Sequence, residues 1–168
     1  MSKKTKKQNV YWDANCFLSY LQEEQQTYKM CEGVIEEAVS GNILIVTSVF
    51  TITEVLGGGS GKLITRETQT EIDSFFKSPF ITVVNVDRSL AEYARSLIWD
   101  YNIPKEDSIH IATASMWDVP IIHTFDKKII QFHNKIPFRE NEFSFIEIKN
   151  PPVYSKPVYS EQTNLFEV

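Results

Sequence analysis

Four acidic residues stand in parts of the sequence where other charges are missing. Asp13 is the only charged residue in 8–22, and Glu54 is the only one in 38–61. Asp107 precedes an uncharged run over 108–117. Between that run and Asp126, the only charged residue is Asp118. Carboxylates in core-forming sequence are costly unless they cap a helix, pair with a partner or bind a cation. These four acids are therefore the first candidates for chemistry.

Each acid, taken alone, also has an ordinary structural explanation. Asp13 could cap a helix, and Asp107 could interact favourably with a helix dipole. Glu54 could extend from a surface helix into solvent, and Asp126 could belong to a turn. A shared site is favoured only because all four fall on one edge of the fold that the sequence predicts.

The elements that must position these acids alternate between strands and helices. Apolar and β-branched runs predict strands at 9–12, 43–46, 81–84 and 120–123, with a fifth at 143–148. Helical periodicity follows Asp13, includes Glu54, and covers about 27–39, 65–77, 88–101 and 104–117. Strands separated by single helices imply right-handed crossovers and a parallel sheet. We therefore expect a single α/β sandwich.

This topology predicts where the acids meet. Asp13 lies at the carboxyl end of the first strand and Asp126 just past the end of the fourth, while Glu54 and Asp107 lie on helices that start from the same edge. Ligands of open parallel sheets bind at that edge. Neighbouring carboxylates raise each other's pKa, and a hard divalent cation relieves this repulsion. Oxygen ligands alone suit Mg²⁺ or Mn²⁺ better than Zn²⁺.

Four short motifs surround the acids: Asp13-Ala-Asn15, Thr-Ile-Thr-Glu54-Val-Leu, Glu106-Asp107-Ser-Ile-His-Ile-Ala-Thr-Ala114 and Thr124-Phe-Asp126. Together they resemble the PIN-domain nucleases, and most of all the VapC-type toxins of toxin–antitoxin pairs, over roughly residues 9–132. The resemblance implies a three-layer α/β/α sandwich whose parallel sheet has about five strands in the order 3-2-1-4-5. It also implies cleavage of RNA that depends on Mg²⁺ or Mn²⁺.

The resemblance places metal-binding acids at positions that match this chain's four carboxylates, with Asn15 and Thr124 in support. We expect Asp13, Asp107 and Asp126 to bind the metal. Glu54 would then orient or deprotonate the attacking water. In-line attack by water predicts 5′-phosphate and 3′-hydroxyl ends. We interpret His110, the only histidine near the acids in sequence, as a supporting contact or a core residue.

Basic residues near the acids are candidates for contacts with a phosphate backbone. Lys62 closes the glycine-rich loop 57–62, which departs from the family pattern and lacks the spacing of a P-loop. That loop is either a flexible connection or a flap whose Lys62 and Arg66 reach a phosphate. Lys127 and Lys128, beside Asp126, are the other candidates.

The overall charge excludes a basic nucleic-acid coat. The chain of 168 residues has 17 basic and 22 acidic residues, a net charge of −5. Four of the basic residues are lysines near the start, Lys3, Lys4, Lys6 and Lys7. The net charge of the rest of the chain is therefore more negative still. With 42% hydrophobic and 12% aromatic residues, the chain is no disordered acidic tail either. We expect a basic tail at 1–8, the nuclease-like domain at 9–148 and a Pro/Tyr-rich arm at 149–168.

Partners and location follow as expectations. Two cysteines form no disulfide framework, and no apolar run reaches membrane length, so we expect a cytoplasmic protein without membrane contact. The resemblance implies an RNA substrate, a homodimer and an antitoxin partner. Two alternatives remain open, a catalytically silent PIN-like scaffold and a phospho-acceptor receiver domain. A receiver needs paired acids directly after its first strand, where this chain has only Asp13.

Overall fold

The computed structural model describes residues 7–56, 64–138 and 141–154. Lys62, the first three lysines of the basic tail and most of the Pro/Tyr-rich arm lie outside these described residues. No helix within the described ranges is long and apolar enough to cross a membrane.

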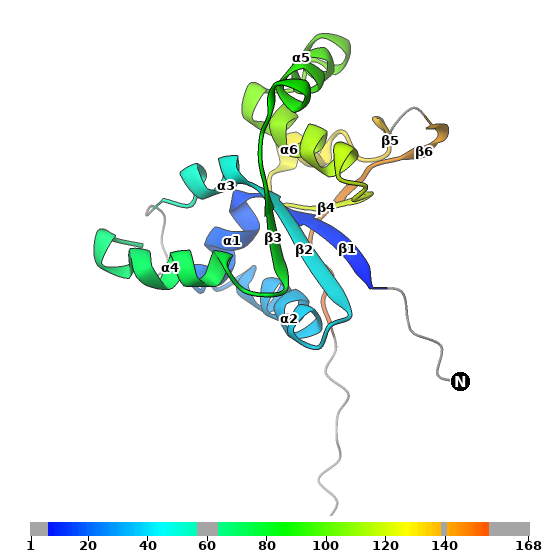
Figure 1. The fold of residues 1–168 in the computed structure, drawn as a ribbon. Helices are drawn as coiled ribbons and strands as arrows, with labels where there is room; N and C mark the ends of the chain where they lie inside the picture. The colour runs from blue at the N-terminus through cyan, green and yellow to red at the C-terminus, as the bar shows by residue number, and fades with distance from the viewer. Residues whose placement is uncertain (1–6, 57–63, 139–140, 155–168) are drawn as a thin grey trace, which may run out of the picture.

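Five parallel strands form the central sheet, in the order β3-β2-β1-β4-β7. The strands are β1 (Gln8–Trp12), β2 (Ile43–Ser48), β3 (Ile81–Val84), β4 (Ile121–His123) and β7 (Glu147–Lys149). Counted along the parallel strands, this is the predicted order 3-2-1-4-5. β1 therefore lies in the centre of the sheet, between β2 and β4 (Figure 1).

The prediction of one fifth strand at 143–148 is wrong in its bounds, because that run contains parts of two strands. β6 (Asn141–Phe145) pairs antiparallel with β5 (Pro137–Phe138) in a separate two-stranded sheet, and only β7 joins the main sheet. The change of partner occurs at Ile146, which is fully buried and whose backbone bonds to Asn134 and Ile136. A hydrophobic run does not reveal such a change, because both strands have the same β-forming composition.

The helices lie close to their predicted positions, apart from 65–77, which is a 3₁₀ turn followed by a helix. Their bounds are α1 (Ala14–Leu21), α2 (Tyr28–Val39), α3 (Val49–Glu54), η1 (Arg66–Thr68), α4 (Gln69–Phe76), α5 (Arg88–Tyr101), α6 (Lys105–Met116) and α7 (Lys127–Ile130).

Helices cover both faces of the sheet, which confirms the three-layer sandwich (Figure 1). Successive side chains of a strand point to opposite faces. Val10 and Trp12 of β1 accordingly pack with buried residues of α1, α2 and α4, whereas Tyr11 packs with residues of α5 and α6. Each face has its own hydrophobic core, and β1 contributes to both.

The beginning of the Pro/Tyr-rich arm is docked on the domain. Pro151 is buried, and Tyr154 lies against Gly33 of α2. A Cβ atom on Gly33 would lie only 2.9 Å from Cδ2 of Tyr154, so a larger residue there would press on the tyrosine ring. The described start of the arm therefore packs on the α1/α2 side of the sheet.

Candidate active site

Asp13 and Thr124 meet where the two neighbouring central strands end. Asp13 directly follows β1 and is 1% exposed, and Thr124 directly follows β4. The Thr124 hydroxyl donates to Oδ2 of Asp13 at 2.5 Å, and its oxygen accepts from the backbone N–H of Asp126 at 2.9 Å. Asn15 also donates to Oδ2 of Asp13, at 3.3 Å. Thr124 thus connects two of the predicted acids, one of them 111 residues away.

Three of the four acids lie at helix N-termini, where backbone N–H groups favour negative charge. Asp13 caps α1 by accepting from the N–H of Cys16 at 3.2 Å. Asp126 caps α7 by accepting from the N–H of Lys128 at 2.7 Å. Asp107 lies in the first turn of α6. Each aspartate therefore has its ordinary structural role at the start of a helix, and this role does not exclude a shared site.

Burial raises the pKa values of two of the aspartates, and Asp107 also lies close enough to two other aspartates to be repelled by their charges. Burial raises the pKa of Asp13, although the charge of His110 and the hydrogen bonds to its carboxylate act in the opposite direction. Partial burial, together with the negative charges of Asp126 and Asp13, raises the pKa of Asp107 to about 6. A bound cation would relieve this repulsion.

Glu54 lies at the opposite end of its helix, as the last residue of α3, and its partner is His110. Oε2 of Glu54 lies 3.0 Å from Nε2 of His110, a close ion pair rather than a well-aligned hydrogen bond. Nδ1 of His110 lies 2.8 Å from the hydroxyl of Tyr11. His110 is 3% exposed, so it is a core residue, and it contacts Glu54.

Sequence reasoning missed Tyr11, which links β1 to this histidine. The alternation of side chains along β1 could have placed Tyr11 and Trp12 on opposite faces. It could not have revealed which residue of α6 lies across from Tyr11, because that depends on how the helix crosses the sheet.

The donor chemistry of the site fits a hard divalent cation, since the three aspartates offer oxygen ligands alone. Within the described residues, no three His, Cys, Asp or Glu side chains are close enough together to hold one ion in this arrangement.

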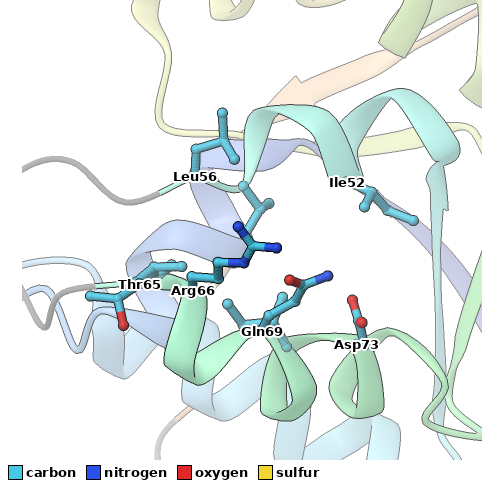
Figure 2. A pocket seen from close by; sticks show the side chains of 9 residues that line it. Ile52, Leu56, Thr65, Arg66, Gln69 and Asp73 are labelled. Carbon is cyan, nitrogen blue, oxygen red and sulfur yellow. The ribbon is translucent and has the colours of Figure 1, made fainter.

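The predicted basic contacts do not all lie together. Lys127 and Lys128 are exposed on α7, directly after Asp126. Arg66 instead lines a groove between α3 and the segment that contains η1 and α4 (Figure 2). Lys62 lies outside the described residues.

The groove that Arg66 lines is largely apolar, with a volume of about 400 Å³. Figure 2 shows Ile52 and Leu56 on one side of it and Arg66, Gln69 and Asp73 on the other. Ile52 and Leu56 flank Glu54 in the sequence, but Glu54 itself does not line the groove. The end of α3 therefore contributes to two different environments.

Comparison with known proteins identifies the class of protein that this fold and site define. The family model of the PIN domain matches residues 10–135, a range that includes all four acids. The chain belongs to the PIN-domain family. A search of curated proteins finds no sequence match. The structure is similar to that of Mycobacterium tuberculosis VapC20, a toxin that cleaves the sarcin-ricin loop, with a TM-score of 0.57 and 13% identity over 71% of this chain and 92% of that chain. At this identity the likeness concerns the fold.

Proposed function

We propose that this protein is a metal-dependent endoribonuclease that hydrolyses RNA phosphodiester bonds. The observation that carries the proposal is the connection of Asp13, Thr124 and Asp126 at the carboxyl edge of the sheet. Asp107 lies close enough for the charges of Asp126 and Asp13 to add to the rise in pKa that its burial causes. Membership of the PIN-domain family and the fold shared with an RNA-cleaving toxin support it.

In this proposal Asp13, Asp107 and Asp126 hold Mg²⁺ or Mn²⁺. A divalent ion supplies charge neutralisation at the non-bridging phosphate oxygens and lowers the pKa of a nearby water. Thr124 keeps Oδ2 of Asp13 in a fixed orientation through its short hydrogen bond, and Asn15 supports the same oxygen.

Glu54 acts on the attacking water. Its side chain is 26% exposed, but Oε2, the oxygen paired with His110, is buried. Solvent therefore contacts other atoms of the side chain. The carboxylate accepts the proton of the water whose oxygen bonds to phosphorus. The bond from phosphorus to the 3′ oxygen then breaks, and that oxygen takes up a proton from solvent, which leaves 5′-phosphate and 3′-hydroxyl ends. Lys127 and Lys128 contact the phosphate backbone in this proposal, and so does Lys62.

Cleavage of single-stranded RNA with and without Mn²⁺ tests the proposal. We expect Asp13→Asn and Asp107→Asn to lower the rate by about 100-fold or more. Asp100→Asn, at an exposed position of α5, is the matched control and retains full activity. Equal activity of all four proteins would overturn the mechanism, and no activity in any of them would favour a silent scaffold.

A role as the toxin of a toxin–antitoxin pair is part of the proposal, with an antitoxin protein as partner and a homodimer as the assembly. Expression of the chain alone should arrest growth through RNA cleavage, and a small co-encoded protein should relieve the arrest. Normal growth at good soluble expression of an active enzyme would contradict the toxin role and leave a nontoxic nuclease. Light scattering of the purified protein tests the homodimer.

A further inference from the structure

Glu54 differs from the other three acids in the backbone groups of its own helix that lie near its carboxylate. Asp13 and Asp126 accept hydrogen bonds from backbone N–H groups at the start of a helix, and Asp107 lies in a first turn. Glu54 lies in the last turn of α3, where unpaired carbonyl groups disfavour negative charge. Its carboxylate therefore needs a partner from elsewhere in the fold.

His110 is that partner, and it is fixed at both ring nitrogens. Because a carboxylate only accepts, the nitrogen that faces Glu54, Nε2, carries a proton. Nδ1 contacts the Tyr11 hydroxyl at 2.8 Å, and the ring centroids of Tyr11 and Phe50 lie 5.7 Å and 5.9 Å from that of the imidazole. The ring thus has little freedom to rotate, and Tyr11 comes from the central strand of the sheet.

We propose that His110 is a positioning residue for Glu54, and that Tyr11, by holding the imidazole, fixes the carboxylate that acts on the attacking water. This inference rests on the proposed nuclease function. His110 acts through Glu54 and touches neither substrate nor metal. Outer partners of this kind change activity by about 10–100-fold when they are removed.

Two substitutions of His110 separate positioning from packing. The amide of His110→Gln reaches the location of Nε2, so it places an N–H group against Glu54, whereas the shorter His110→Asn reaches only the location of Nδ1. We expect His110→Asn to lower kcat by about 10–100-fold with KM changed less than about 3-fold. His110→Gln should stay within about 5-fold of the original kcat. His123→Gln, a buried histidine on the other face of the sheet, is the matched control and should leave kcat unchanged.

A double-mutant cycle tests whether His110 acts through Glu54. In a Glu54→Gln background, His110→Asn should cause no further loss of kcat, because the carboxylate that it positions is already gone. Tyr11→Phe should lower kcat in the original protein and have no effect beside His110→Asn. Independent, additive losses would overturn the inference, and so would equal activities of His110→Asn and His110→Gln.

A second readout needs neither metal nor RNA. In the metal-free protein, the Nε2 proton of His110 should give an NMR signal that shifts in Glu54→Gln and stays in place in Asp100→Asn. If Asp13→Asn abolishes cleavage but His110→Asn changes neither kcat nor this signal, only the positioning role fails. If Asp13→Asn cleaves RNA as well as the original protein, the proposed function fails, and the inference fails with it.

Discussion

Two buried histidines contact adjacent residues of β1, and the protein shifts their pKa values in opposite directions. His110 is 3% exposed and contacts Tyr11; His123 is 2% exposed and contacts Trp12. Burial disfavours the charged form of both. The contact with Tyr11, the pairing with Glu54 and the charge of Asp13 nevertheless raise the pKa of His110 to about 10. Burial, with the positive charge of Lys149 nearby, lowers the pKa of His123 to about 4.

The difference arises from the partners on the two faces of the sheet. His123 accepts a hydrogen bond at Nδ1 from the indole N–H of Trp12, at 3.3 Å, which requires a free lone pair on that nitrogen. His110 faces a carboxylate, which requires a proton. Tyr11 of β1 therefore contacts a positive imidazole from α6 on one face of the sheet, and Trp12 contacts a neutral imidazole from β4 on the other.

The largest expected effect on the free energy of unfolding follows from removing the polar side chain of His110. His110→Leu leaves the buried oxygen of Glu54 and the Tyr11 hydroxyl unpaired, and we expect the free energy of unfolding to fall by about 4 kcal/mol. His123→Leu removes one neutral hydrogen bond and should cost about 1 kcal/mol. Urea unfolding at pH 7 measures both. Equal losses would show that burial, and not the partner, distinguishes the two histidines.

The next effect concerns acid. Unfolded His123 takes up a proton below its ordinary pKa of 6.5, while the folded residue resists protonation until about pH 4. From this residue, the free energy of unfolding falls by about 3 kcal/mol as pH drops from 6.5 to 4. Asp13 and Asp107, whose pKa values are raised, act in the opposite sense over this range.

Comparison with His123→Gln isolates the contribution of this histidine, because the aspartates are present in both proteins. The variant should lose less stability than the original protein between pH 6.5 and 4, measured by urea unfolding at several pH values. Parallel curves for the two proteins would contradict a neutral His123.

Threonine hydroxyl groups at the strand ends give a second comparison between charged and neutral partners. Thr124→Val removes a hydrogen bond to the buried carboxylate of Asp13, and we expect a loss of about 2 kcal/mol. Thr47→Val removes hydrogen bonds to neutral partners, the carbonyl of Trp12 and the hydroxyl of Thr51, and should cost about 1 kcal/mol. The order of the two thermal unfolding midpoints checks this; the reverse order would contradict a stronger hydrogen bond from Thr124 than from Thr47.

The smallest effect tests packing on the α2 side. Alanine is a better helix former than glycine by about 1 kcal/mol, but a methyl group at Gly33 would press on Tyr154. We expect Gly33→Ala to be near neutral in the original protein and stabilising by up to about 1 kcal/mol in a Tyr154→Ala background. The same gain in both backgrounds would show that the arm does not dock on α2 in solution.

Much of the site could be predicted because carboxyl ends of parallel strands share one edge. Strand ends place Asp13 and Asp126 near each other, and the structure joins them through Thr124. The pairing of Glu54 with His110 could not be predicted, since it depends on the angle at which α3 and α6 approach the sheet. The exchange of strand partners at Ile146 escaped prediction for a similar reason, because backbone pairing over long distances leaves no mark on local composition.

The central position of β1 in the sheet has a consequence for folding during synthesis. Asp13 directly follows β1, but the neighbouring strand β4 and the residues Thr124 and Asp126 come more than 100 residues later in the chain. Until those residues emerge, β1 lacks its neighbour on one side and Asp13 lacks its hydroxyl partner. If the protein cuts RNA as proposed, its site is therefore incomplete beside the RNA of its own ribosome until β4 and Asp126 have been made.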